Sequence, residues 1–367
     1  MNLEGLDPGG LYIGRSWSET QKGPVIVRVS NGIVCDITAP GVATVRDILE
    51  LDDPAGTVSQ LPGRVITKTN PLPPCDLQAI KACGVTFVSS MLERVIEERA
   101  AGDPALAQDL RDDLSAAIGD TITSLVPGSP AADRAKKALI KQGLWSQYLE
   151  VGIGPDAEVF TKAQPMSSVG HQALIGLHPI SKWNNPEPEI VLAVNSKGRV
   201  QGATLGNDVN LRDVEGRSAL LLGKAKDNNG SCSIGPFIRL FDDTYTIDDI
   251  RRAELTLTVT GRDGYVLNGA SSMAQISRDP LDLVAQTIGA HHQYPDGFML
   301  FLGTLFAPTK DRSAPGQGFT HEIGDIVRIA SPGLGVLENT VALSTECPPW
   351  TFGTSHLLRN LAARGLI

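Results

Sequence analysis

The sequence is short of cysteine, of basic clusters and of long apolar runs, and each shortage argues against a class of protein. Its 367 residues include five scattered cysteines with no Cys-x-x-Cys pair, which argues against a disulfide framework and a thiolate zinc site. Lys and Arg number 32 against 41 Asp and Glu, so the net charge is −9. A nucleic-acid-binding surface needs a basic stripe, and none is present. No nucleic-acid partner is therefore expected.

A membrane-spanning segment is also missing from the sequence pattern. The longest apolar stretch, Phe298 to Ala307, is interrupted at Gly303 and is far shorter than the ~20 residues that a transmembrane helix needs. The first ten residues carry Glu4 and Asp7 and have neither a basic start nor an apolar centre, unlike a signal peptide. The expectation is a cytoplasmic protein with no membrane partner.

Turn-forming residues are abundant. Glycine (38) and proline (24) together make 62 of the 367 residues, above the usual ~12%. Hydrophobic residues make up 41% and charged residues 20%, which is ordinary for a folded chain. Frequent turns between short apolar runs predict a β-rich protein of the α+β class.

A proline-rich segment near residue 72 divides the chain. N-terminal to this segment, strands are predicted over Val25–Val29 and Ile33–Ile37 and a helix over Thr44–Leu51. Pro71-Leu-Pro-Pro74 is a stiff, non-helical connector, because proline fixes φ and biases the preceding residue towards extended geometry. We expect a small N-terminal α/β domain of residues 1–75 and a second domain of residues 76–367.

The second domain begins with helices and continues as strands. Apolar residues at three- and four-residue spacings predict a helical segment at about 90–148, with helices over 90–101, 105–118 and 131–142. β-branched runs broken by Gly, Asn and Asp then predict strands, and a later helix is expected at Pro280–Ile288 with Asp279 or Arg278 near its N-terminus. The predicted strands cover 159–161, 190–194, 200–205, 255–260 and 326–329.

Three carboxylates form the most informative pattern. Glu187 and Glu189 are two apart in an extended segment, so both side chains point to one face. Like charges held together favour a bound cation, and Asp208, which ends the next strand pattern, can add a third oxygen. An all-oxygen site of this kind suits Mg²⁺ or Mn²⁺. By itself, however, Glu-x-Glu is weak evidence, because it is more often a pair of acids on a solvent-exposed strand face.

The order of the surrounding segments resembles the fumarylacetoacetate hydrolase family. The resemblance runs from about Ala82 to the C-terminus, and it implies a rolled, mixed β fold that forms a homodimer or homotetramer. It also implies that Glu187, Glu189 and Asp208 bind Mg²⁺ or Mn²⁺ and that Lys226 contacts substrate. The segments that carry it are Glu187-Pro-Glu189, Gly206-Asn-Asp208-Val-Asn-Leu-Arg-Asp213, Ala225-Lys226, Gly235-Pro236 and Gly303-Thr304.

One motif departs from the family pattern. Many members carry Asn-Tyr-x-x-His-x-x-Glu on a lid, whereas this chain has Thr86-Phe-Val-Ser-Ser90-Met-Leu-Glu93. Serine replaces histidine, which puts water activation by a His–Glu pair in doubt. Other segments are similar to the branch of the family that dehydrates a 2-keto-3-deoxy-pentonate to 2,5-dioxopentanoate. They include Gly84-Val-Thr-Phe-Val, Gly143-Leu-Trp-Ser-Gln-Tyr148, Lys224-Ala-Lys-Asp-Asn-Asn229 and Gln293-Tyr-Pro-Asp-Gly297.

The resemblance implies a lyase (hydro-lyase) whose small-molecule substrate is a 2-keto sugar acid. Lys226 either holds substrate oxygens as an ammonium or acts as a base if its pKa is lowered. Glu93 and Glu215 are the acid/base candidates. For each, the alternative interpretation is a solvent-exposed glutamate without a catalytic role. Ser90, Gly303 and Thr304 are assigned to substrate binding. The alternatives are a hydrolase or decarboxylase of acylpyruvate-like 2-keto acids, and a sugar-acid binding protein without activity.

Overall fold

The computed structural model describes residues 3–107, 125–304, 306, 308, 310–312 and 318–367. Within these ranges no helix combines the length and the apolar character needed to cross a membrane. Strands and helices are both present, with most of the core built by strands. The α+β, β-rich class predicted from the sequence is confirmed.

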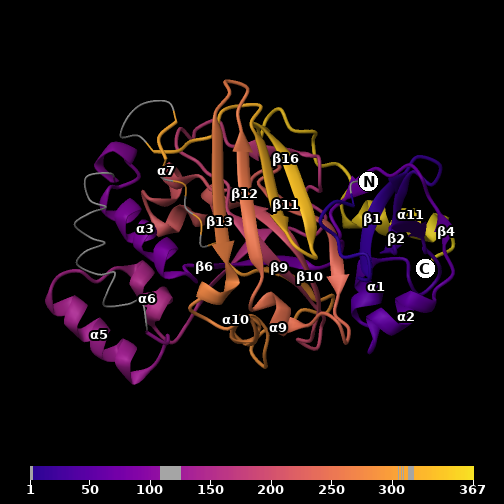
Figure 1. Ribbon diagram of the computed structural model, residues 1–367, viewed down its shortest axis with the longest axis horizontal. Coiled ribbons are helices and arrows are strands. Elements are labelled where there is room, and N and C mark those ends of the chain that lie inside the picture. Colours follow the sequence, from indigo (N-terminus) through magenta and orange to yellow (C-terminus); the bar gives the residue numbers. More distant parts are fainter. Residues whose placement is uncertain (1–2, 108–124, 305, 307, 309, 313–317) are drawn as a thin grey trace.

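Two sheets make up the centre of the molecule (Figure 1). The larger has the order β4-β3-β2-β1-β11-β10-β9-β14-β6-β7, with β5 paired to β1, and the smaller has the order β13-β12-β15-β16-β8. The strands of the larger sheet are β1 (Tyr12–Ser18), β2 (Gly23–Ser30), β3 (Ile33–Asp36), β4 (Arg64–Val65), β5 (Pro71–Leu72), β6 (Ala79–Gly84), β7 (Glu158–Ala163), β9 (Pro188–Val194), β10 (Val200–Asp208), β11 (Cys232–Leu240) and β14 (Phe298–Phe301). Those of the smaller sheet are β8 (Leu174–Leu177), β12 (Glu254–Thr260), β13 (Val266–Ser272), β15 (Ile326–Ser331) and β16 (Gly335–Leu343).

The main core lies between the sheets. Along β9 every residue is buried, as expected of a central strand covered on both faces. Along β12 buried and more exposed residues alternate, as expected of a strand with one face towards solvent. Leu192 and Leu205 of the larger sheet share one apolar cluster with Leu257 and Ile329 of the smaller sheet. The strands that end at the candidate site are therefore fixed by a two-sided apolar environment.

The N-terminal strands join the larger sheet directly. Tyr12 of β1 pairs with Arg239 of β11, and helix α11 (Thr354–Ala363) covers this end of the molecule. Leu357 and Leu361 of α11 are buried in a cluster with Ala43. Figure 1 shows the N-terminal strands and α11 at one end and helices α3, α5 and α6 at the other. The division into domains at residue 75 stays a prediction.

Helices α3 (Val88–Arg99), α5 (Pro130–Lys141) and α6 (Gln147–Ile153) form a separate packed group. Met91, Leu139 and Leu149 are buried in its apolar cluster. This group confirms the helices predicted over 90–101 and 131–142. Most of the helix predicted over 105–118 falls on residues 108–118, outside the described residues. Further helices in the described ranges are α1 (Val45–Leu49), α2 (Pro54–Gln60), α7 (Arg212–Glu215), α8 (Leu222–Lys226), α9 (Ile247–Ile250), α10 (Pro280–Thr287) and the 3₁₀ turns η1 (Ala219–Leu221) and η2 (Met273–Gln275).

Local sequence patterns place several elements well. Each strand predicted after residue 150 lies within an observed strand. The later helix begins as predicted, because Asp279 accepts a hydrogen bond from the N–H of Leu281 (2.8 Å) and Pro280 occupies the first turn. Capping and periodicity are local properties, so the sequence alone locates these elements.

Candidate active site

The three predicted carboxylates meet where β9 and β10 pair. The register sets Gly206 beside Glu189 and Asn207 beside Pro188. The N–H of Asp208 donates to the carbonyl oxygen of Glu187 (3.0 Å). Glu187, Glu189 and Asp208 are all buried, and one carboxylate oxygen from each lies within 4.8 Å of the others. The expected convergence is confirmed.

Lysines balance part of this negative charge. Lys162 Nζ lies 2.7 Å from Asp208 Oδ1, and Lys226 Nζ lies 3.2 Å from Asp208 Oδ2. Lys226 also bonds to Glu187. Burial alone would raise the pKa of Asp208, but the two lysines outweigh it and lower that pKa. Asp208 is therefore a carboxylate that remains ionised.

Glu189 has a different environment. It accepts a hydrogen bond from the backbone N–H of Gly303 (2.6 Å). Burial raises its pKa well above the usual range, and the neighbouring Asp208 and Glu187 raise it further. A hard divalent cation fits this donor set, because it needs several oxygen ligands and would stabilise the ionised form of Glu189.

A small pocket opens beside the carboxylates. Five of the six other predicted site residues line it, from four different parts of the chain. They are Ser90, Glu215, Lys226, Gly303 and Thr304. The remaining lining residues are Cys83, Gly84, Val85, Arg94, Glu158, Phe160 and the three carboxylates.

Glu93 is not among the described residues that line this cavity. It lies on α3, and its carboxylate is 3.2 Å from Arg212 Nη2. Arg212 is buried, and its guanidinium lies 4.3 Å from the ring centroid of Trp183. The sequence placed Glu93 on the correct helix, but the direction of its side chain depends on this distant arginine.

Lys226 ends α8 and is buried. Burial alone would lower its pKa, but Asp208, Glu187 and Glu215 outweigh burial and raise it. Of the two roles left open by the sequence, this environment favours the ammonium that holds substrate oxygens over a lysine base.

Gly303 and Thr304 form another part of the wall, near the start of α3, which carries the segment that matches the lid motif of the family and is called the lid helix below. Gly303 has φ +90°, and a Cβ there would lie 2.0 Å from Thr86 Oγ1, so glycine is required. The N–H of Phe306 donates to Thr304 Oγ1 (3.1 Å). The threonine hydroxyl thus bonds to the backbone of Phe306 while Thr304 lines the cavity.

Three charged residues at this site were not predicted from the sequence: Arg94, Glu158 and Lys162. Glu158 and Phe160 share one face of β7, since strand side chains repeat every second residue. Lys162 lies where the pairing of β7 with β6 shifts register, and its ammonium reaches Asp208. Charged residues on both sides of the short predicted strand were the available signal. Burial, reinforced by Glu215, raises the pKa of Glu158 to about 7. Glu158 therefore titrates near neutrality while it faces the cavity.

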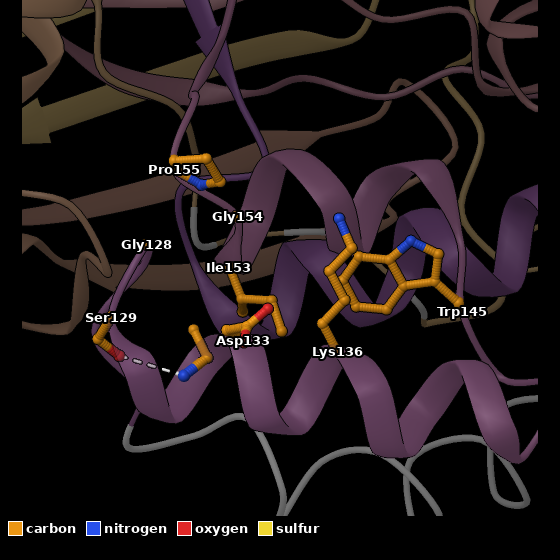
Figure 2. A pocket seen from close by; sticks show the side chains of 9 residues that line it. Gly128, Ser129, Asp133, Lys136, Trp145, Ile153, Gly154 and Pro155 are labelled. Carbon is orange, nitrogen blue, oxygen red and sulfur yellow. Dashed lines mark hydrogen bonds between the residues drawn. The ribbon is translucent and has the colours of Figure 1, made fainter.

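A second hollow lies between α5 and the end of α6 (Figure 2). Trp145, Ile153 and Pro155 line it together with Lys136 and Asp133 of α5. Lys136 is paired with Glu150 and lies 5.1 Å from the ring centroid of Trp145. This hollow shares no lining residue with the carboxylate cavity.

The sequence is similar to known proteins over about half of its length. Residues 150–342 match the family model described as fumarylacetoacetate (FAA) hydrolase, C-terminal. A "Probable 2-keto-3-deoxyxylonate dehydratase" of Haloferax volcanii is 33% identical over 195 residues, which are 53% of this chain and 63% of that protein. A 2-dehydro-3-deoxy-D-arabinonate dehydratase of Saccharolobus solfataricus is 31% identical over 183 residues, 49% of this chain and 57% of that protein.

Solved structures share the fold. A 2-keto-3-deoxy-D-arabinonate dehydratase in its apo form has a TM-score of 0.64 at 19% identity, over 90% of this chain and 99% of that one. A complex of such a dehydratase with magnesium and 2,5-dioxopentanoate has a TM-score of 0.63, again at 19% identity, over 90% and 99%. These similarities confirm the architecture that the sequence resemblance implied.

Proposed function

The chain belongs to the fumarylacetoacetate hydrolase family, and we propose that it dehydrates a 2-keto-3-deoxy-pentonate, derived from D-xylonate or D-arabinonate, to 2,5-dioxopentanoate. The single observation that carries this proposal is the buried trio of Glu187, Glu189 and Asp208 at the wall of a small cavity. Two relatives that cover half of the chain are named dehydratases of such acids. The chain matches 63% and 57% of the lengths of those relatives.

Glu187, Glu189 and Asp208 would hold Mg²⁺ or Mn²⁺. When bound, such a cation supplies Lewis-acid polarisation of the carbonyl of a 2-keto acid, which acidifies the neighbouring C3 hydrogens. The buried ammonium of Lys226 would hold substrate oxygens, because its pKa is raised and it stays charged. Ser90, Gly303 and Thr304 would complete the walls around the substrate.

Two carboxylic acids in the cavity suit the two proton transfers of the elimination, which removes a C3 proton and the C4 hydroxyl and leaves a C3=C4 double bond. A proton shift from C5 to C3, followed by protonation of the resulting enol at C4, then gives the C5 aldehyde. Glu158, with its pKa near 7, is suited to accept a C3 proton. Burial raises the pKa of Glu215, which favours the protonated form needed to donate a proton to the leaving C4 hydroxyl. Glu93 stays a candidate for either transfer, although Arg212 now holds its carboxylate.

The lid supports elimination rather than hydrolysis. Ser90 Oγ donates to the carbonyl oxygen of Phe87 (2.9 Å), and no histidine occurs among the described residues that line the cavity. Activation of a water by a His–Glu pair therefore has no residue to perform it there. We also propose that the protein is cytoplasmic and forms a homodimer or homotetramer.

The test is incubation of the full chain and Mg²⁺ with 2-keto-3-deoxy-D-xylonate. Formation of 2,5-dioxopentanoate, followed by an aldehyde-specific reagent and by NMR, is expected. Release of pyruvate or CO₂ would instead indicate a carbon–carbon hydrolase or decarboxylase. Binding without turnover, measured by calorimetry, would indicate a binding protein, and both of these results contradict the proposal. Asp208→Asn, which lacks one proposed metal ligand, is the control for a contaminating activity.

A further inference from the structure

Arg94 is a charged residue of the cavity that the proposed chemistry does not use. It lies on α3, one turn after Ser90, and both side chains line the cavity. Arg94 Nη1 is 2.9 Å from Glu215 Oε2, and Arg94 Nη2 bonds to Glu187. One arginine from the lid helix thus reaches a proposed metal ligand and a proposed acid.

The orientation of Arg94 is fixed by Glu97, a residue outside the cavity lining. Arg94 Nη1 donates to Glu97 Oε2 (2.7 Å), and Glu97 in turn accepts from Arg212 Nε (2.6 Å). Glu97 is buried, and it does not line the cavity. A buried carboxylate held between two guanidinium groups keeps a fixed position, because each lost contact would leave a buried charge unpaired. The guanidinium of Arg94 is therefore preorganised towards the cavity.

The other cations at the site, Lys162 and Lys226, are less exposed than Arg94. Lys162 and Lys226 both pair with Asp208, and their side chains are 0% and 3% exposed. The side chain of Arg94 is 13% exposed. A guanidinium carries five N–H donors in a planar fork that matches a carboxylate. Arg94 is thus the more accessible positive group for a ligand that enters the cavity.

Charge balance indicates what that ligand needs. Five carboxylic acids line the cavity, namely Glu158, Glu187, Glu189, Asp208 and Glu215, against the side-chain cations Arg94 and Lys226 and the divalent cation that three of the acids would hold. A 2-keto acid brings a further negative charge. Lid-borne positive charge would offset the repulsion between such a ligand and these walls.

We propose that Arg94 is a specificity-determining residue that recognises the negative charge of the 2-keto acid. This inference rests on the proposed function and adds to it how the lid helix selects an anion. α3 places the guanidinium at the cavity, and the hydrogen bonds from Arg212 to Glu97 and from Arg94 to Glu97 fix its orientation. A neutral analogue of the same shape would not use this contact.

The test measures binding of pyruvate, the smallest 2-keto acid, and of its neutral methyl ester to the Mn²⁺-loaded full chain by calorimetry. Arg94→Gln should weaken pyruvate binding by about tenfold or more, the usual range for a lost charge-assisted contact. Methyl pyruvate binding should not change. Mn²⁺ affinity, measured separately by electron paramagnetic resonance, should hold or increase, because a repelling positive charge has been removed.

Arg99→Gln is the matched control, since Arg99 is exposed on the same helix and donates to the carbonyl oxygen of Gly143 (3.2 Å). Its pyruvate and Mn²⁺ affinities should equal those of the wild type. If Arg94→Gln does not fold, Arg94→Lys keeps the charge without the planar fork. That variant should lose pyruvate affinity and keep Mn²⁺ affinity.

Three results would overturn the inference. These are unchanged pyruvate binding in the Arg94 variants, equal losses for pyruvate and its ester, and a parallel loss of Mn²⁺ affinity. The last would make Arg94 a residue that positions Glu187. A wild-type protein that binds pyruvate through Arg94 but forms no 2,5-dioxopentanoate would refute the proposed function and leave this inference intact.

Discussion

At the scale of single residues, the site shows how environment separates side chains of one chemical type. Burial acts on both Glu189 and Asp208 and favours their neutral forms. Two lysines overcome it at Asp208, whereas Glu189 has a backbone N–H as its partner. Glu158 falls between them, with a pKa of about 7. One carboxylate is thus kept ionised, and another is placed to exchange a proton.

Glu158→Gln should remove the proposed base. Below pH 7 the carboxyl of Glu158 is mostly protonated, so wild-type kcat/KM should fall by about tenfold per pH unit as the pH decreases from 7. The variant should lose about 10²–10⁴-fold in kcat and lack this limb of the profile. The measurement is the pH dependence of kcat/KM at saturating Mg²⁺.

The control for this experiment is Glu254→Gln, because Glu254 is exposed at the start of β12 in the smaller sheet. Its profile should match that of the wild type. An acid limb at the same pH in Glu158→Gln would assign the titration to another group and refute the role of Glu158.

Asp208→Asn should weaken cation binding. The variant loses a charged oxygen ligand and leaves Lys162 and Lys226 with less compensation. Mn²⁺ affinity measured by calorimetry should fall by about a hundredfold or more, and Tm should fall as well. Asp133→Asn on the exposed face of α5 should change neither property. Unaltered Mn²⁺ affinity in Asp208→Asn would exclude Asp208 as a ligand.

At the scale of elements, the lid helix is set by unusual backbone at both ends. Val85, three residues before α3 begins, has φ +58°, a region that β-branched residues rarely occupy. Ala101 and Gly102, just after it, have φ +52° and +77°. Thr86 Oγ1 donates to the carbonyl oxygen of Leu302 (2.7 Å), which ties the start of the lid to the chain beyond β14. The lid is therefore positioned by packing against the sheet as well as by helix propensity.

Gly303→Ala should disturb this connection. The new Cβ would lie 2.0 Å from Thr86 Oγ1, and alanine would be strained at φ +90°. We expect a loss of about 2–5 kcal/mol in the free energy of unfolding, from overpacking and backbone strain together. Urea unfolding measures it, and adding Thr86→Ala should restore part of the loss by removing the obstructing oxygen.

Gly289→Ala is the control, since no atom lies within 4 Å of a Cβ built there. Its stability should be close to that of the wild type. If Gly303→Ala and Gly289→Ala are equally stable, the contact between Thr86 and the segment after β14 is not rigid. That result would contradict the positioning of α3 by this contact.

At the scale of the whole molecule, the C-terminus stabilises the N-terminal strands. Asn360 of α11 donates to the carbonyl oxygen of Gln21 (2.9 Å), and Arg364 donates to that of Pro24 (2.8 Å). The strands covered in this way continue the sheet that carries the carboxylates, through β1 and β11. Segments from the two ends of the chain thus extend the scaffold of the site.

Leu361→Ala should separate stability from activity. Leu361 is fully buried under α11, so its truncation should cost about 2–4 kcal/mol of stability. Well below the lowered Tm, kcat should stay at the wild-type value, because α11 contributes no residue to the cavity lining. Leu358→Ala, exposed on the same helix, is the matched control and should leave both quantities unchanged. A large loss of kcat in folded Leu361→Ala would contradict this separation.

The sequence by itself determined the features that depend on near neighbours. Glu187 and Glu189 share a side because strand side chains alternate, and Asp279 with Pro280 starts α10 because capping is local. Asp208 was a candidate third ligand because it ends the next strand pattern, and the family resemblance added Lys226.

Only the tertiary structure decided which charges meet. Arg94 and Glu158 are 64 positions apart in the sequence, yet both line one cavity, whereas Glu93, beside Arg94 on the same helix, lies against Arg212. Such contacts arise from how helices and strands distant in the chain pack together. They set burial and neighbouring charge, and these two quantities fix the pKa values that local sequence patterns do not encode.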